Sequence, residues 1–138
     1  IRVGINSGHP KTRTSQMMAF GRDQVLKKAE VDNVVNYVRS LSDPAVAKEV
    51  PAAKLDAGKA VFAANCVACH GDDAKGKADV GAPNLTDRLW IYGGDAESVY
   101  TTVWGGRQGH MPSWDGRLSP LDRKILALYL IDLRRSDQ

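Results

Sequence analysis

Apolar residues recur every three or four positions in several stretches of the chain, which is the spacing of one face of a helix. Residues 55–65 are one such stretch, and their shared face consists of Leu55, Gly58, Val61 and Phe62. Residues 96–104 are another, with Asp95 placed as the N-cap and Gly105 at the end. Because no segment alternates apolar and polar residues with a period of two, we expect an all-α fold.

A longer helix is predicted from residue 120 onward. Ser119 is a suitable N-cap, Pro120 suits the first helical position, and Asp122 resembles the acidic member of a capping box. The residues expected to face the protein interior are Leu121, Ile125, Leu128 and Tyr129.

A fourth helix is predicted over residues 29–41. Its apolar stripe consists of Val31, Val34, Val35, Val38 and Leu41. A stripe of this size needs a partner. We expect that partner to be the C-terminal domain of this chain, a second copy of the chain, or another chain.

The four helices fall on either side of residues 42–54, where Pro44, Pro51 and small alanines interrupt the periodicity. This segment is interpreted as a linker. The predicted organisation is a truncated first domain over residues 1–43, a linker over 44–54, and a complete domain over 55–138.

The part before the linker repeats the end of the chain. Gly4, Gly8 and His9 have the same spacing as Gly105, Gly109 and His110; "MMAF" parallels "MPSW", and "VVNYVRSL" parallels "LALYLIDL". In this alignment Met17 matches Met111, and Tyr37 matches Tyr129. The first copy has no counterpart of residues 55–104, so it looks like a first domain that lacks its cysteine-containing half.

Composition narrows the class of protein. The 138 residues carry a net charge of +3 with charges of both signs interspersed, so nucleic-acid binding is not expected. No apolar run is long enough to cross a membrane, and a membrane link would come through partner subunits or an N-terminal span outside this sequence. Two cysteines are too few for a disulfide scaffold, which favours reactive or ligating thiols.

Those cysteines lie in "NCVACHG", where Cys66, Cys69 and His70 would share one helical turn. This C-x-x-C-H motif is typical of covalent haem attachment, with two thioether bonds and a histidine ligand. A thioredoxin-like dithiol should lie between a strand and a helix, and no strand is expected. A closed zinc site would need four ligands, for which only His9 and His110 remain as plausible nitrogen donors.

The opposite haem face needs a second ligand if the iron is six-coordinate. Met111 is the only methionine after the linker and lies in a Gly- and Pro-containing loop, where a core-filling role is unfavourable. A thioether is a soft neutral ligand that suits ferrous iron. His110 is the rival ligand. A five-coordinate haem enzyme or gas sensor would require that Met111 not bind iron.

These segments resemble a known family. "FAANCVACHGDDAKGKADVGAPNLTD", "LWIYGG" and "GGRQGHMPSWDGRLS" resemble class I cytochrome c, in particular the second haem domain of the dihaem cytochrome c subunit (subunit III) of cbb3-type oxidases. "INSGHPKTRTSQMMAFGRD" and "AEVDNVVNYVRSLSD" resemble the tail of that subunit's first haem domain.

The resemblance implies a role for each matching residue. Cys66 and Cys69 would form the thioethers, with His70 and Met111 as axial ligands. Pro83 matches the proline whose carbonyl accepts a hydrogen bond from the proximal histidine. Further haem-pocket positions are Leu85, Trp90, Tyr92, Arg107 and Trp114, with Arg107 a candidate for a haem propionate. For the missing first haem, the ligand is either Met17 or Met18.

The resemblance also implies a function: one-electron transfer towards the catalytic subunit of a terminal oxidase in aerobic or microaerobic respiration. The chain would be no enzyme by itself, and the intact complex would be the cytochrome c oxidase. Expected partners are the catalytic and mono-haem cytochrome subunits, with a soluble cytochrome c or the quinol-oxidising complex as electron donor. One haem c is expected here and two in the intact subunit, on the periplasmic side of the bacterial cytoplasmic membrane.

Two alternatives remain within electron transfer: a free mono-haem cytochrome c, and the cytochrome subunit of a periplasmic dehydrogenase. Neither explains the half repeat. A haem-free thiol oxidoreductase is the alternative from another class.

Overall fold

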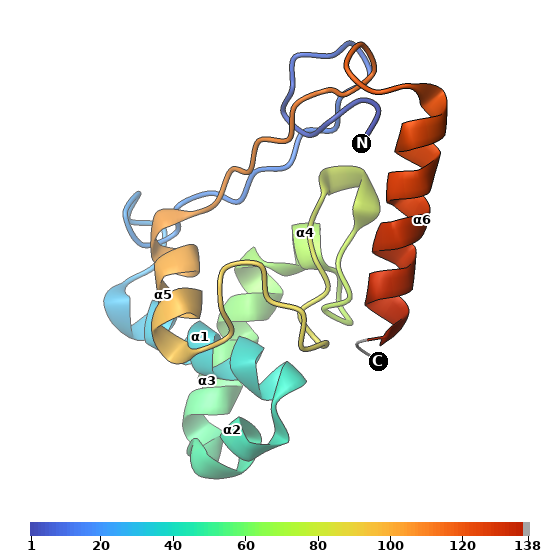
Figure 1. Ribbon diagram of the computed structural model, residues 1–138. Helices are drawn as coiled ribbons and strands as arrows, with labels where there is room; N and C mark the ends of the chain where they lie inside the picture. Colours follow the sequence, from blue (N-terminus) through green and yellow to red (C-terminus); the bar gives the residue numbers. More distant parts are fainter. Residues whose placement is uncertain (137–138) are drawn as a thin grey trace. The chain divides into compact units, whose positions relative to one another are not determined.

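The computed structural model describes residues 1–136, with side chains through residue 133. Its helices are α1 (Lys28–Ser42), α2 (Pro44–Glu49), α3 (Ala52–Asn65), α4 (Val67–His70), α5 (Ala96–Gly105) and α6 (Pro120–Ser136), with a 3₁₀ turn η1 (Ala78–Val80) (Figure 1). Only isolated β-bridges occur among the described residues. The fold is therefore all-α, as predicted. In the described range, none of the helices combines the length and the apolar character that a membrane crossing requires.

The chain forms two compact units. The central unit consists of Gln16–Gln108, and the terminal unit combines Ile1–Ser15 with the chain from Gly109 onward. The central unit contains α1 to α5, and the terminal unit contains α6.

Local capping fixes where several helices begin. The Asp95 carboxylate accepts a hydrogen bond from the Ser98 amide (2.9 Å) at the start of α5. Ser119 Oγ accepts one from the Asp122 amide (3.1 Å) at the start of α6. Both caps were predicted. The segment interpreted as a linker contains α2, which Asp43 caps through the Ala45 amide (2.9 Å).

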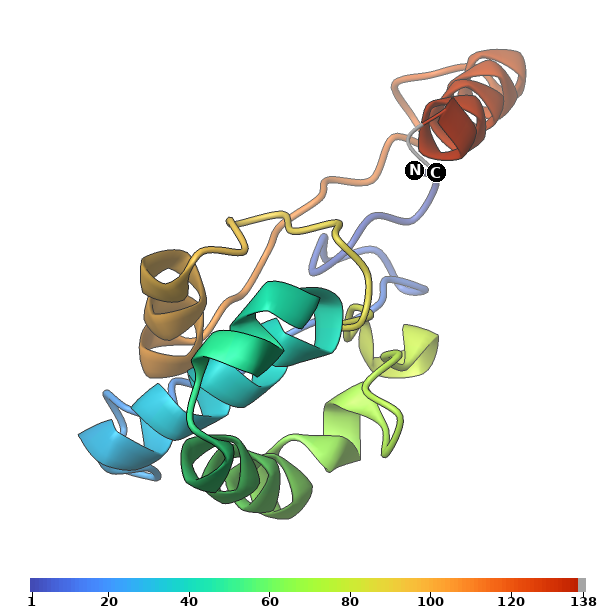
Figure 2. The ribbon, with the colours of Figure 1, turned by 90° about the horizontal axis from the view of Figure 1, so that it is seen from below.

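The core of the central unit is built around α1. Val31 and Val34 are 0% and 1% exposed, and α1 packs against both α3 and α5 (Figures 1 and 2). Tyr37 of α1 contacts the ring of Phe62 in α3, with centroids 5.5 Å apart. The predicted stripe thus has its partner inside this chain, the first of the three possibilities. The buried core residues are Phe20, Leu26, Val31, Val34, Val35, Val38, Phe62, Ala74, Val99 and Val103.

The interface between α1 and α3 is closest at Gly58. A Cβ atom there would lie 2.7 Å from Tyr37 Cβ and would also meet the Asn33 carbonyl. Only glycine allows the two backbones to approach this closely.

The prediction that α6 faces the interior is wrong for the described structure. The residues expected inside are largely exposed: Leu121 65%, Ile125 55%, Leu128 66% and Tyr129 58%. Within the central unit, α1, whose sequence matches that of α6 in the repeat, packs against α3 and α5. Helix periodicity identifies an apolar face but not which of two similar helices is buried.

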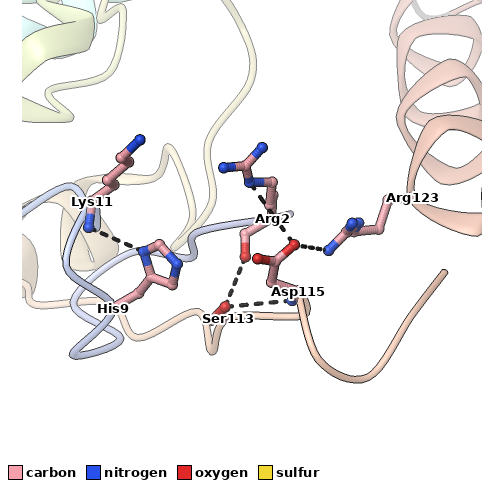
Figure 3. Close-up of polar contacts among 6 residues, drawn as sticks. All are labelled: Arg2, His9, Lys11, Ser113, Asp115 and Arg123. Atoms are coloured by element: carbon pink, nitrogen blue, oxygen red, sulfur yellow. Dashed lines mark hydrogen bonds and ion pairs between the residues drawn. The ribbon is translucent and has the colours of Figure 1, made fainter. Parts of the chain in front are cut away.

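Main-chain pairing joins the two ends of the chain in the terminal unit. Ile5 and Met111 exchange backbone hydrogen bonds of 2.8 and 2.9 Å, and the Asn6 side chain donates to the Gly109 carbonyl. In Figure 3, the Asp115 carboxylate accepts a hydrogen bond from Arg123, and Ser113 Oγ donates to the Arg2 carbonyl (2.8 Å).

The central unit contains the matching pair. Met17 and Arg107 exchange backbone hydrogen bonds of 2.8 and 3.0 Å. Glycine is required beside each pair, because Gly4 (φ +70°) lies against the Met111 carbonyl and Gly106 (φ +69°) lies against the Met17 carbonyl. The two copies of the repeat thus form similar backbone pairings, in which Gly4 corresponds to Gly106 and not to Gly105 as in the sequence alignment.

Candidate haem-attachment site

The C-x-x-C-H motif lies where α3 ends and α4 begins. Cys66 caps α3 through a hydrogen bond from its amide to the Phe62 carbonyl (2.8 Å). One helical turn follows, in which the His70 amide donates to the Cys66 carbonyl (2.9 Å) and the Cys69 amide donates to the same oxygen (3.2 Å). The two sulfurs and the imidazole therefore come from one turn, as their spacing predicted.

His70 is held in one orientation. It is 8% exposed, and its Nδ1 lies 3.1 Å from the Pro83 carbonyl oxygen, to which Nδ1–H donates. This hydrogen bond selects the tautomer in which Nε2 carries the lone pair that a metal needs. Burial lowers the pKa of His70, and the hydrogen bond to Pro83 opposes that effect only in part. The imidazole is therefore neutral and suited to ligation at neutral pH.

The loop from residue 71 to residue 85 places the Pro83 carbonyl. The Gly76 amide donates to the His70 carbonyl (2.8 Å), and the Leu85 amide donates to the Ala74 carbonyl (2.8 Å). Gly76 has φ +81°, and a Cβ atom there would lie 2.6 Å from the Pro83 oxygen. Gly76 could not be identified from the sequence, because a loop glycine shows this role only when the loop's path is known.

The thiols suit attachment better than redox chemistry. Cys66 and Cys69 form no disulfide, and Cys69 is exposed. Burial, with a smaller effect from Cys69, raises the pKa of the Cys66 thiol to about 11. A catalytic redox cysteine needs the opposite shift. No cluster of three or more His, Cys, Asp or Glu side chains that could hold a metal occurs in the described part of the chain.

Four other predicted pocket residues also belong to the central unit. Leu85 and Trp90 are partly buried and pack against the core. The Arg107 guanidinium lies 4.2 Å from the centre of the Tyr92 ring, and its Nε donates to Thr102 Oγ1 (3.0 Å). Arg107 therefore has partners of its own within the protein.

One arginine near these residues was not identified from the sequence. Arg39 of α1 donates through Nε to the Gly94 carbonyl (3.2 Å), and it lines a hollow of about 320 Å³ with Arg88 and Trp90. Because Arg39 is far from these residues along the chain, its position beside them could not be predicted from the sequence.

The remaining predicted residues, Met111 and Trp114, belong to the terminal unit, as does the rival ligand His110. His110 Nδ1 is 2.9 Å from the Asn6 carbonyl oxygen. The Trp114 ring lies 5.6 Å from the Arg117 guanidinium. Ligation of iron by Met111 stays a prediction.

An all-α fold with a C-x-x-C-H turn, two free thiols and a histidine oriented by a proline carbonyl defines a c-type cytochrome, the class that binds haem c covalently. Within that class, the chain belongs to the family described as "Cytochrome C oxidase, cbb3-type, subunit III", whose profile matches residues 53–130.

Similar proteins are named as subunits of cbb3-type cytochrome c oxidases. The chain is 54% identical over 133 residues to "Cbb3-type cytochrome c oxidase subunit FixP" of Bradyrhizobium sp. (strain ORS 278), covering 96% of this chain and 45% of the relative. It is 42% identical over 125 residues to "Cbb3-type cytochrome c oxidase subunit CcoP" of Cereibacter sphaeroides (strain ATCC 17023), covering 91% and 42%. The chain thus spans less than half the length of these relatives.

Proposed function

We propose that this chain transfers single electrons through one covalently bound haem c and relays them to the catalytic subunit of a cbb3-type terminal oxidase. The observation that carries the proposal is the turn of Cys66, Cys69 and His70, with His70 Nδ1 hydrogen-bonded to the Pro83 carbonyl at 3.1 Å. When bound there, a c-type haem supplies an iron that cycles between the ferrous and ferric states.

Each residue of the turn has one task. Cys66 and Cys69 provide the thiols for the two thioether bonds, and His70 Nε2 provides the proximal ligand. The Pro83 carbonyl fixes the His70 tautomer and, by accepting the Nδ1 proton, increases the basicity of the imidazole. These groups hold the cofactor and adjust its reduction potential.

Met111 is proposed as the sixth ligand. A thioether there stabilises ferrous iron, raises the potential and leaves no open position for oxygen or substrate. The chain is then an electron-transfer subunit, and oxygen reduction is a reaction of the complex.

Membership of this family supports proposals for the domain organisation, the partners and the location of the chain. The proposed organisation is a segment of a first cytochrome c domain (residues 1–43), a linker (44–54) and a second cytochrome c domain (55–138), with a second haem in the intact subunit. Proposed partners are the catalytic and mono-haem cytochrome subunits, with a soluble cytochrome c or the quinol-oxidising complex as donor. The site would face the periplasm, where c-type haem is attached.

The proposal is tested on the chain produced in a host with haem-maturation machinery. Mass spectrometry should show one covalently bound haem. The visible spectrum of the ferric form should show the weak band in the red that is typical of methionine ligation, and the ferrous form should not bind carbon monoxide. A polypeptide mass without haem from that host would refute the function.

A pair of variants tests the sixth ligand. Met111→Ala should weaken the methionine band and allow the ferrous iron to bind carbon monoxide. It should also lower the reduction potential, by on the order of 100 mV in the molecules that lose the ligand. The control His110→Ala should leave all three properties unchanged. The reverse result would assign the sixth position to His110.

A further inference from the structure

Met111, the proposed sixth ligand, is held through its backbone in the terminal unit. The Ile5 amide donates to the Met111 carbonyl (2.8 Å), and the Met111 amide donates to the Ile5 carbonyl (2.9 Å). Both polar groups of the Met111 backbone are therefore bonded to a single residue near the start of the chain. The point from which the methionine side chain leaves the backbone is fixed by that residue.

Further hydrogen bonds join the methionine loop (residues 109–114) to the N-terminal segment (residues 1–6). Before the methionine, Asn6 Nδ2 donates to the Gly109 carbonyl (2.6 Å). After it, Ser113 Oγ donates to the Arg2 carbonyl (2.8 Å), as Figure 3 shows. The methionine loop is therefore bonded to the N-terminal segment on both sides of its methionine.

Gly4 is the residue of the N-terminal segment that lies closest to this loop. A Cβ atom there would collide with the Met111 carbonyl oxygen and would lie 2.9 Å from the Pro112 carbonyl carbon. Gly8, a little further along, also has a positive φ (+75°, against +70° for Gly4), but a Cβ atom there would meet nothing within 4 Å. Alanine is strained by its φ at both positions, and only at Gly4 does it also press on the methionine loop.

The N-terminal segment belongs to the first copy of the sequence repeat, and the methionine loop belongs to the second. The central unit contains the same contact with the copies exchanged, because Met17 of the first copy pairs with Arg107 of the second. An arrangement in which each copy offers the other the same two segments is typical of an isologous interface. The contact at Met111 is therefore a property of the repeat.

We infer that residues 4–6 are positioning residues for Met111, through which the first copy of the repeat adjusts the reduction potential of the haem attached at Cys66 and Cys69. The inference rests on the proposed function for that haem and for Met111 as its sixth ligand. Groups that orient a ligand also adjust the metal, and a thioether bond to iron stabilises the ferrous form. The methionines before α1 remain with the first haem of the intact subunit.

The test uses the haem-loaded 138-residue chain and compares Gly4→Ala with its matched control Gly8→Ala. A second pair, Asn6→Gly and the control Ser7→Gly, removes side chains without adding atoms. Asn6 bonds the methionine loop, whereas Ser7 Oγ donates to the Val3 carbonyl (2.6 Å). Glycine is chosen because Asn6 has a positive φ (+52°). The readouts are the methionine band of ferric iron, the fraction of ferrous iron that binds carbon monoxide, and the reduction potential.

Gly4→Ala and Asn6→Gly should weaken the methionine band, increase the fraction of ferrous iron that binds carbon monoxide and lower the reduction potential. Both controls should retain the values of the unsubstituted chain. In a Met111→Ala background, Gly4→Ala should have no further effect on the potential, because the ligand that it positions is absent. A residue with a merely structural role would not show this dependence on the methionine.

The inference is overturned if Gly4→Ala and Asn6→Gly retain the band and the potential, or if Gly8→Ala changes them as much as Gly4→Ala. It is also overturned if Gly4→Ala lowers the potential equally in the Met111→Ala background. Circular dichroism checks the helices, and if Gly4→Ala does not fold, the comparison of Asn6→Gly with Ser7→Gly gives the answer. None of these results changes the haem mass measured by mass spectrometry, on which the proposed function depends.

Discussion

Replacement of Gly58 by alanine tests the close contact between α1 and α3. An added Cβ atom would lie 2.7 Å from Tyr37 Cβ and 2.8 Å from the Asn33 carbonyl carbon, whereas ordinary contacts begin at 3.4 Å. The helices must therefore separate by at least 0.7 Å, the difference between 3.4 and 2.7 Å, because the Asn33 carbonyl oxygen lies closer still. Because two of the opposing atoms belong to the Asn33 backbone, a side-chain rotation cannot relieve the clash.

Two opposing terms set the magnitude. Overpacking a well-packed interface costs about 1–3 kcal/mol, and replacing glycine by alanine within a helix returns about 1 kcal/mol. Separation of the helices also strains the contact between Tyr37 and Phe62, and such aromatic pairs contribute about 0.5–1.5 kcal/mol. We expect Gly58→Ala to lower the free energy of unfolding by about 1–2 kcal/mol.

Urea unfolding followed by far-ultraviolet circular dichroism measures this change. The control is Gly105→Ala at the end of α5, where an added Cβ atom meets nothing within 4 Å. The control should be neutral or slightly stabilising. If Gly58→Ala gains stability as the control does, α1 does not pack against α3 as described.

Three further predictions concern the site and its supports. Gly76→Ala should displace the Pro83 carbonyl and weaken its hydrogen bond with His70, which should raise the reduction potential measured in a redox titration. Gly71→Ala is the control, because Gly71 also has a positive φ but an added Cβ atom there would meet only Asp73 Oδ1, at 3.1 Å. This control should raise the reduction potential less. In the haem-free chain at pH 8, iodoacetamide should label the exposed Cys69 before Cys66, because burial raises the pKa of the Cys66 thiol to about 11. Peptide mass spectrometry measures both labelling rates. The rate at Cys66 should continue to increase as the pH is raised towards that pKa. Hydrogen bonds from Ser98 lower the pKa of Asp95, so the cap on α5 is complete above the unfolded-state pKa and is lost as pH falls through the lower folded-state value. The protection factor of the Ser98 amide, which is its exchange rate corrected for the intrinsic rate at each pH, should decrease there. Asp95→Asn, which caps without titrating, should remove that decrease.

Features that depend on neighbouring residues were predictable from the sequence. Asp95 and Ser119 cap the helices that they were predicted to cap, because an N-cap bonds to amides two or three residues ahead. The turn of Cys66, Cys69 and His70 follows from helical spacing alone. The start of α2 also had a local signal, since Asp43 precedes Pro44 at the first helical position, but the two prolines led to its interpretation as part of a linker.

Features that depend on distant residues were not predictable. Periodicity gave α1 and α6 an apolar face each, yet the choice of α1 as the cover of α3 depends on contacts such as Gly58 with Asn33, 25 positions apart (58 − 33). Gly76 was missed because its importance comes from its position beside the Pro83 carbonyl.

The pairing of the chain's two ends also sets an order of folding. The Ser113 hydroxyl reaches the Arg2 carbonyl across 111 residues, and Asn6 reaches Gly109 across 103. Closing a flexible loop of that length costs about 4 kcal/mol of chain entropy, and prior folding of the intervening residues reduces that cost. During synthesis, the hydrogen bonds between residues 1–6 and residues 109–114 cannot form until residue 109 has emerged, whereas every residue of the central unit is then already available. The central unit can therefore assemble before residues 1–6 pair with residues 109–114.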